Sequence, residues 1–333
     1  MLDFSKFKSI KSLINYFHDE ETCKQALAEA RWGDDVICPR CGKHHCTKRT
    51  DGRFRCNECK YNFSCTIGTI FYRSKLPLQV WFIAMYLISS HKKSVSSLQI
   101  MRDCEVTQKT AWFMENKIRS LYEQTDAVAL SGKVEMDEMY LGGRETNKHK
   151  SKRTEGTQGR STKTKTPIFG MVQRDGKTVA MKVEDTKGAT LMPIVSQFVE
   201  EGSTTYTDEV NIYCKLTENG YDHLFVNHGK REYVRANDIH TNSIEGFWAH
   251  FKRVIFSTYH SVSKDYLQRY IDEQLYRWNT REQDASWRFE DMLKRCLKPC
   301  DYADVLSLSS VVNVVEWKRV KAEKYRIYAQ RVA

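Results

Sequence analysis

A chain of 333 residues is long enough for a small domain and a second domain with a hydrophobic core of its own. Hydrophobic residues make up 41% of it, close to the proportion in globular proteins, so nothing in the composition requires a disordered chain. The formal net charge of +11 favours nucleic acid over an acidic or apolar partner, although a solvated basic surface without a partner would carry the same charge.

The start of the chain lacks the apolar core of a secretory signal, because Lys residues interrupt the apolar ones. The most apolar run, residues 80–88, is about half as long as a bilayer crossing and predicts a buried helix. We therefore expect an intracellular protein without membrane contact. In that setting, paired cysteines among the 11 in the chain indicate metal binding rather than disulfides.

Residues 1–35 are predicted to be helical, because apolar residues recur there at three- and four-residue steps. The recurring residues are Phe7, Ile10, Leu13, Ile14 and Phe17.

Two Cys-x-x-Cys pairs identify residues 36–67 as a predicted zinc ribbon. Cys38 and Cys41 are separated by fourteen residues from Cys56 and Cys59, and two knuckles at this spacing can place four thiolates around one tetrahedral Zn²⁺. A site closed by four cysteines has no open coordination position, so the zinc is expected to be structural. Two alternatives stay open at this point, namely four unpaired thiols and ligation by His44, His45 or Cys46.

Residues 68–130 are predicted to be helical, with a polar break around residues 103–105. Thr107 is the expected N-cap of a helix that runs through Ile118. With the helix before the break, this would form a helix-turn-helix whose second helix can enter a DNA major groove. Ordinary packing of two helices remains an alternative, since the apolar side chains, such as Trp112, must be buried in either case.

Residues 131–290 are predicted to form one α/β domain, and residues 291–333 a C-terminal tail. The expected order is a strand from residue 134, a loop (142–166), a hairpin (168–173 and 177–183), a helix (189–200), a strand (203–207), a short helix (216–220), a strand (224–226) and two helices (242–255 and 264–279). The loop is basic, with eight Lys and Arg against two Glu. This order is typical of a ribonuclease-H-like mixed sheet flanked by helices, here preceded by the small zinc ribbon and the helical segment.

Acidic residues fall on three of these elements. Asp137 lies in the first strand, and Asp208 ends a short strand. In the helix over 242–255, Asn242, Glu245 and Lys252 fall within one arc of about 80° at 100° per residue. Carboxylates in such places suit two Mg²⁺ or Mn²⁺ ions, which activate the attacking oxygen and stabilise the leaving one in phosphodiester chemistry. Lys252 would reach a phosphate.

These motifs resemble insertion-sequence transposases that have an amino-terminal zinc ribbon and a DDE-type catalytic core, specifically the ISXO2-like group. The matching segments are Arg31-Trp32 with Cys38-Pro-Arg-Cys-Gly42, the Cys56/Cys59 pair, Asp137-Glu-Met-Tyr-Leu-Gly-Gly143, Thr207-Asp208-Glu209, His240-Thr-Asn-Ser-Ile-Glu-Gly-Phe-Trp248 with Lys252-Arg253, and Tyr276-Arg-Trp-Asn-Thr-Arg281. The run from His240 to Trp248 is the most specific of them.

The resemblance implies metal-dependent nicking at transposon ends and transfer of the freed 3′-hydroxyl to target DNA. It also implies terminal inverted repeats and target DNA as partners, a homo-oligomer on the DNA and a location at the nucleoid. In such families the third metal ligand can be Asn or Glu. Glu245 is favoured because it carries a full charge seven residues before Lys252, and Asn242 stays open.

Two other functions are consistent with the same sequence. One is a ribonuclease-H-like nuclease that cuts DNA without strand transfer. The other is a DNA-binding regulator that keeps the fold but has lost catalysis, and the presence of all three acidic positions argues against it.

Overall fold

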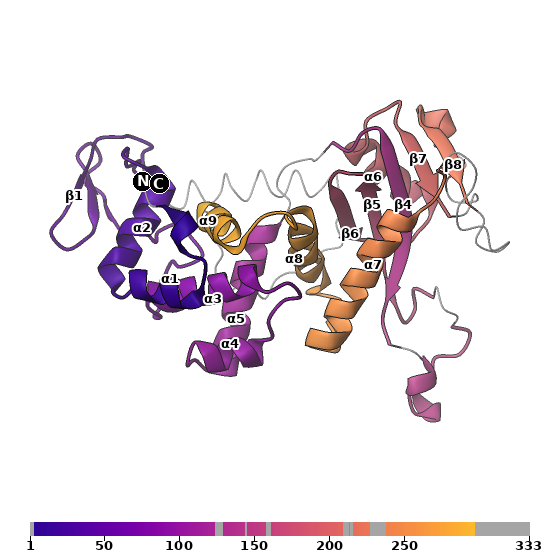
Figure 1. The fold of residues 1–333 in the computed structure, drawn as a ribbon, viewed down its shortest axis with the longest axis horizontal. Coiled ribbons are helices and arrows are strands. Elements are labelled where there is room, and N and C mark those ends of the chain that lie inside the picture. The colour runs from indigo at the N-terminus through magenta and orange to yellow at the C-terminus, as the bar shows by residue number, and fades with distance from the viewer. Residues whose placement is uncertain are drawn as a thin grey trace. The chain divides into compact units, whose positions relative to one another are not determined.

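The structure is a computed structural model that describes residues 3–123, 129–143, 145–157, 161–208, 213, 216–226 and 238–296. The chain divides into two units, and most of their helices and strands are labelled in Figure 1. Among the described residues, the first unit contains 3–123 and 280–296, and the second contains the segments between 129 and 279. No helix in these ranges is long and apolar enough to cross a membrane.

Helices build most of the first unit. They are α1 (Ile10–Tyr16), α2 (Glu20–Trp32), α3 (Leu78–Ser90), α4 (Ser97–Asp103), α5 (Gln108–Arg119) and α9 (Ala285–Arg295). The predicted buried helix is α3, in which eight of thirteen residues are buried. The sequence pattern did not predict α9, which spans the expected domain boundary at residue 290. This helix packs in the first unit, where the ring of Phe289 lies 6.0 Å from that of Phe7.

Two details of the helical segments differ from the sequence pattern. Ile14, predicted to share the apolar face of α1, is 39% exposed. Leu13 and Phe17 are four residues apart and occupy the buried side, so Ile14 is turned about 100° away from it. The helical segment after residue 76 is interrupted twice rather than once. Helix α3 ends at Ser90, and α4 begins after the N-cap residue Ser96, whose side chain accepts a hydrogen bond from the Gln99 N–H.

The ribbon is a three-stranded antiparallel sheet of β1 (Cys46–Lys48), β2 (Phe54–Cys56) and β3 (Asn62–Phe63). Phe54 and Phe63 stack across β2 and β3 with ring centroids 5.8 Å apart. Trp32 at the end of α2 contacts both rings edge-on. The ribbon is therefore anchored to the helical part by an aromatic cluster.

Helices α4 and α5 correspond to the predicted helix-turn-helix. Thr107 caps α5 as predicted, accepting a hydrogen bond from the Thr110 N–H at 3.2 Å. Gln108 and Lys109 in its first turn are exposed, whereas residues 114–119 are buried. The start of α5 is therefore the part of this helix that a partner can reach.

The second unit is built on a mixed five-stranded sheet, as predicted. Its strands are β4 (Lys133–Leu141), β5 (Thr166–Gln173), β6 (Thr178–Lys182), β7 (Thr204–Thr207) and β8 (Asp222–Phe225), in the order β6-β5-β4-β7-β8. Strands β4, β5 and β6 are antiparallel neighbours, while β7 is parallel to both β4 and β8. Asp175, with a φ of 56°, turns the predicted hairpin between β5 and β6.

Helices cover both faces of this sheet. Val134 and Met136 of β4 belong to the core formed with α6 (Gly188–Phe198). Met139 of β4 belongs to the core formed with α7 (Asn242–Val254) and α8 (Leu267–Asn279). Since successive side chains of a strand alternate between faces, the odd-numbered residues of β4 point toward α7. This alternation places Asp137 under α7.

Side chains of α8 form hydrogen bonds with backbone groups of β6, at the edge of the sheet. Asn279 accepts a hydrogen bond from the Thr178 N–H and donates one to the Thr178 carbonyl, at 2.8 and 2.9 Å. The Lys182 N–H donates to the Gln268 side chain at 2.8 Å. Two residues of α8 therefore replace a neighbouring strand and protect an edge that would otherwise be open to pairing.

Candidate functional site

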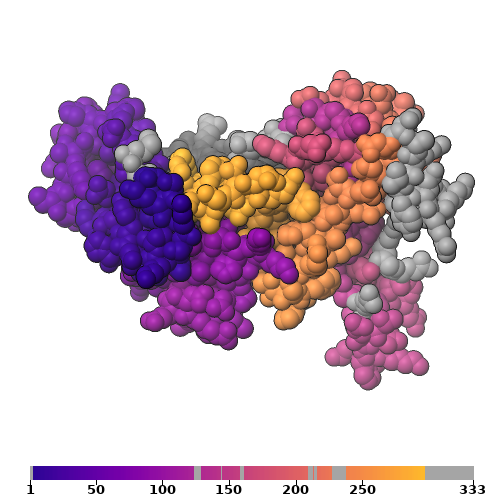
Figure 2. All heavy atoms as spheres, in the orientation of Figure 1, coloured from indigo at the N-terminus to yellow at the C-terminus, as the bar shows by residue number. Residues whose placement is uncertain are grey.

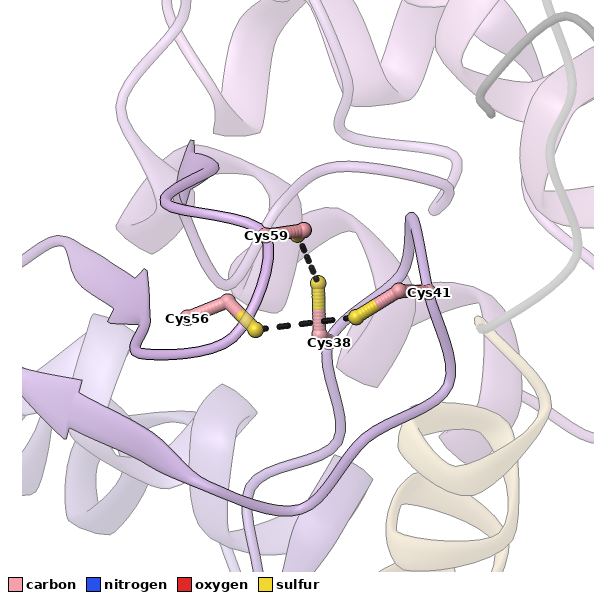
Figure 3. A group of neighbouring side chains, drawn as sticks. All are labelled: Cys38, Cys41, Cys56 and Cys59. Atoms are coloured by element: carbon pink, nitrogen blue, oxygen red, sulfur yellow. Dashed lines mark hydrogen bonds between the residues drawn. The ribbon is translucent and has the colours of Figure 1, made fainter.

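Four cysteine side chains converge in the ribbon (Figure 3). The sulfurs of Cys38 and Cys59 lie 3.7 Å apart, and those of Cys41 and Cys56 lie 3.6 Å apart. Four sulfurs bound at about 2.3 Å to one zinc ion would lie about 3.8 Å from each other at the corners of a tetrahedron, so the cluster fits zinc. It is the only group of three or more His, Cys, Asp or Glu in the described ranges whose ligand atoms all lie within 4.8 Å of one another.

The alternative ligands are outside this cluster. The imidazoles of His44 and His45 lie 2.5 and 3.4 Å from carboxylate oxygens of Asp35 and Glu58, on the surface of the ribbon. Cys46 is the cross-strand neighbour of Cys56 but is not a member of the group of four. The four cysteines of the two pairs are therefore the set that the fold brings together.

The second unit places Asp137 and Asp208 on neighbouring strands. Asp137 is in the middle of β4, and Asp208 directly follows β7. In this parallel pair, Glu135 is opposite Tyr206. Continuing the register by two residues puts Asp208 opposite Asp137, with both side chains on the face toward α7.

Charge and burial act together on this pair of carboxyl groups. Burial, together with the negative charges of Asp208 and Glu138, raises the pKa of Asp137 to about 8. Two carboxylates that repel each other in a half-buried place are stabilised by a cation that binds between them. Glu138 itself points to the opposite face, where it accepts a hydrogen bond from the buried Tyr213 hydroxyl.

Trp248 of α7 forms the wall beside Asp137. Gly170 of β5 is opposite Asp137 in the antiparallel pair, and a Cβ at this glycine would lie 2.5 Å from Cζ2 of the Trp248 ring. The indole is therefore in contact with the backbone next to Asp137. Its buried N–H has no well-aligned acceptor among the described residues, yet it is close enough to Asp137 to act against the rise in that pKa.

The remaining predicted site residues lie along α7. Ile244, Phe247 and Phe251 are buried, whereas Asn242, Glu245 and Lys252 are exposed, so the helix has the predicted apolar and polar sides. Within the part of the chain that the structure describes, Glu245 does not complete a close three-carboxylate cluster with Asp137 and Asp208. The Glu245 carboxylate accepts a hydrogen bond from the Thr241 hydroxyl at 3.3 Å.

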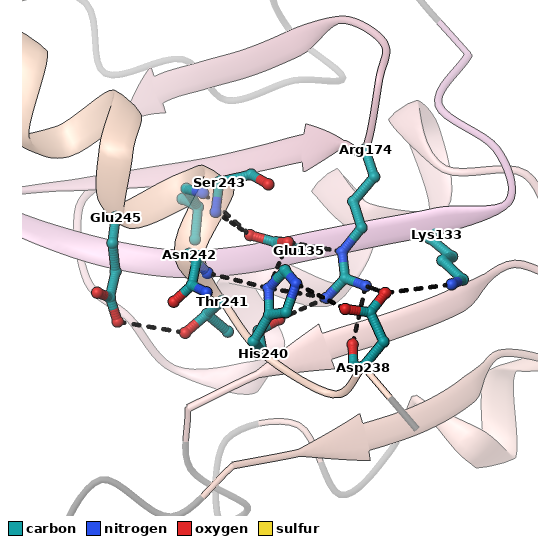
Figure 4. A network of polar contacts seen from close by, with 10 residues as sticks. Lys133, Glu135, Arg174, Asp238, His240, Thr241, Asn242, Ser243 and Glu245 are labelled. Atoms are coloured by element: carbon teal, nitrogen blue, oxygen red, sulfur yellow. Dashed lines mark hydrogen bonds and ion pairs between the residues drawn. The ribbon is translucent and has the colours of Figure 1, made fainter. Parts of the chain in front are cut away.

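Sequence reasoning missed a cluster of polar residues around the buried Glu135, next to this site. Glu135, Arg174 and His240 form hydrogen bonds and ion pairs with one another at the start of α7 (Figure 4). One signal was available for Glu135, because it precedes Asp137 by two residues and must share its face of the strand. Arg174 follows β5 and gave no such signal.

The chain is similar to domains and proteins of known transposable elements. Residues 129–279 match the model of the ISXO2-like transposase domain, and residues 18–62 match that of the transposase zinc-ribbon domain. A protein in transposable element ISH50 of Halobacterium salinarum is 29% identical over 272 residues, which cover 78% of this chain and 90% of that protein. A transposase-like protein of Haemophilus influenzae is 29% identical over 106 residues, or 32% of this chain and 84% of that protein.

Proposed function

Because the chain belongs to the insertion-sequence transposases with a zinc ribbon and an ISXO2-like domain, we propose that it cleaves DNA at the ends of its element and joins the freed 3′-hydroxyl to target DNA. Asp137 and Asp208 are proposed to hold divalent metal ions on a ribonuclease-H-like sheet. A residue in the first turn of α7, Glu245 or Asn242, provides the third ligand.

The observation that carries this proposal is the pairing of Asp137 with Asp208. They come from adjacent parallel strands and point to one face, and burial together with the charge of Asp208 raises the pKa of Asp137. Carboxylate oxygens are the ligands that Mg²⁺ and Mn²⁺ prefer, so the residues present fit these ions. When bound, two such ions would activate the attacking oxygen and stabilise the leaving oxygen of a phosphodiester.

Other parts of the chain are proposed to hold the DNA rather than to cut it. The exposed start of α5, with Gln108 and Lys109, is suited to a major groove. The ribbon, organised by a structural zinc ion at its four cysteines, exposes Arg49, Arg53 and Arg55. Lys252 on α7 can contact a phosphate near the site. Expected partners are therefore terminal inverted repeats and target DNA, bound by a homo-oligomer.

The test is cleavage and joining of a labelled transposon end in Mg²⁺ or Mn²⁺. Asp137→Ala and Asp208→Ala should abolish both steps and leave end binding largely intact, because other contacts hold the DNA. Asp222→Ala, at an exposed position of β8, is the matched control and should remain active. Full activity of the Asp137 and Asp208 variants would disprove the proposal. Cutting without any joined product would indicate a nuclease instead.

The same assay identifies the third ligand. If Glu245 binds the metal, Glu245→Gln should lose nearly all activity and Asn242→Ala should lose less. The opposite ranking would assign the role to Asn242.

A further inference from the structure

Glu135 is a fully buried carboxylate on β4, on the same face as Asp137. Its Oε2 accepts hydrogen bonds from the backbone N–H groups of Ser243 and Ile244 at 2.8 and 3.0 Å (Figure 4). These two groups belong to the first turn of α7, and Thr241, the N-cap residue of that helix, makes no side-chain cap. Glu135 therefore supplies, from a strand, the acceptor that a helix start usually takes from its own N-cap.

Arg174 and His240 complete the surroundings of this carboxylate. Arg174 Nε donates to Glu135 Oε1 at 2.7 Å, and its terminal nitrogens donate to the backbone oxygens of Asp238 and His240 at 2.9 and 2.8 Å. His240 Nδ1 lies 3.3 Å from the same Glu135 oxygen. The guanidinium also lies over the ring of Tyr206 in β7, 4.2 Å from its centroid.

Glu135 and its partner Arg174 together connect the elements that carry the proposed catalytic residues. The carboxylate is on the strand of Asp137, Tyr206 is on the strand that leads to Asp208, and the capped turn carries Asn242 and Glu245. A buried charge is retained only where partners satisfy it, and removing one partner leaves the other uncompensated. The network therefore allows little change in where α7 begins relative to β4.

We propose that Glu135 is a positioning residue of the active site, which holds the first turn of α7 beside Asp137 by capping the helix from its own strand. This inference rests on the proposed function for its catalytic consequence. Glu135 touches no reacting atom. It acts through the placement of the third metal ligand, whichever of Asn242 and Glu245 that is, and Arg174 keeps its carboxylate oriented toward the helix.

The kinetic test compares Glu135→Ala and Glu135→Gln with the wild type. The Ala variant should lose the cap, so kcat for end cleavage should fall about 10- to 100-fold, the usual effect of removing a group that orients a metal ligand. The Kd for end DNA should not change, and raising the Mn²⁺ concentration should recover part of the activity. The Gln variant keeps an oxygen for the two N–H groups and should retain more activity than Ala.

A matched control separates positioning from a general loss of stability. Glu273 on α8 is also fully buried and pairs with Arg277 at 2.9 Å in the same unit. Glu273→Gln should lower Tm by an amount comparable to Glu135→Gln but leave kcat and its Mn²⁺ dependence unchanged. Equal kcat values for Glu135→Ala and the wild type would overturn the proposal.

A second measurement does not depend on activity. Hydrogen exchange of the Ser243 and Ile244 amides should become faster in Glu135→Ala and stay at the wild-type rate in Glu273→Gln. Unchanged exchange in Glu135→Ala would show that the cap does not hold the helix, and would overturn the proposal. Should the wild-type protein cut no DNA, the proposed function fails, and the exchange rates still decide whether Glu135 fixes the start of α7.

Discussion

At the scale of single residues, Asp137 lowers the stability of the folded chain while providing a carboxylate for the proposed metal site. Its carboxyl group is buried beside Asp208 and Glu138, and in the absence of a cation this environment favours the protonated form, with the pKa raised from 3.8 to about 8. An acid that is hard to ionise destabilises the folded chain at neutral pH, and the same feature supports the proposed binding of a divalent cation.

This cost can be measured by substituting Asn for Asp137. Between the unfolded pKa near 3.8 and the folded pKa of about 8, the folded wild type binds more protons than the unfolded chain, so its stability falls as pH rises. Asn has no carboxyl group to ionise. In metal-free buffer, the Tm difference between Asp137→Asn and the wild type should therefore shift in favour of the variant from pH 4 to pH 8 and level off above that.

The control for this experiment is Asp222→Asn, which changes an exposed carboxyl group of β8. Its Tm difference from the wild type should stay nearly constant over the same pH range. A constant difference for Asp137→Asn as well would contradict the raised pKa.

The zinc cluster offers a second comparison between single residues. Cys38→Ser should remove zinc from the protein, because three thiolates leave the tetrahedral site incomplete. Cys46→Ser changes the thiol opposite Cys56, outside the group of four, and should leave about one zinc per chain. Metal analysis of the purified variants decides the matter, and equal zinc loss in both would make Cys46 a ligand.

Some residues of the two sites could be predicted from the sequence, and others could not. The cysteine spacing indicated the four residues that the fold brings together, because two knuckles impose a local geometry. Strand alternation and the glycine-rich end of β4 pointed to Asp137. The role of Arg174 could not be predicted, since it depends on a register between β4, β5 and the start of α7 that no local pattern specifies.

At the scale of secondary-structure elements, the contact between α7 and β5 requires a glycine. A Cβ at Gly170 would lie 2.5 and 2.7 Å from two ring carbons of Trp248 and 3.1 Å from Ile244 Cδ1. The helix would have to move away from the sheet, and the proposed metal site is located at this contact.

Gly170→Ala should therefore destabilise the protein by about 1–3 kcal/mol, as overpacking of a core usually does, and should lower Tm measurably. Gly246→Ala is the matched control, because a Cβ there would meet only the Trp278 ring, at an ordinary 3.9 Å. That variant should be neutral or more stable, since Ala favours a helix by about 0.5–1 kcal/mol over Gly. A stable Gly170→Ala protein would show that α7 is not packed this closely.

Most elements of the second unit could be predicted because their periodicity is strong. The β5–β6 hairpin, α6 and α7 begin and end within a few residues of the expected positions. The helix predicted at 216–220 is a short 3-10 helix, Thr217–Asn219. Helix α9 was missed because its apolar residues pack against residues far away in the sequence, Phe289 against Phe7 and Met292 against Tyr122, and because it spans the expected domain boundary at residue 290.

At the scale of the whole molecule, the excess of positive charge is unevenly distributed. The segment between β4 and β5 contains eight Lys and Arg against two Glu, and its described part has two short turns, Glu145–Asn147 and Lys150–Lys152. Figure 2 shows this part as a protrusion of the second unit. Lys150, Lys152 and Lys163 are exposed, and we expect them to contact phosphates of bound DNA without reading its sequence.

Replacing these three lysines by Gln should weaken binding to all DNA sequences alike. Each phosphate contact that is lost removes about 0.9 from the slope of log Kd against log salt, so the slope should fall by up to about 3.

Lys6, Lys8 and Lys11 are also exposed, in the first unit, and serve as the control, because the same change in net charge there should leave the slope nearly unchanged. Binding titrations from 50 to 200 mM salt measure both, a range over which such contacts alter affinity strongly. A loss confined to one DNA sequence would mean that the segment reads bases, and equal slopes for the two triple variants would mean that only the net charge matters.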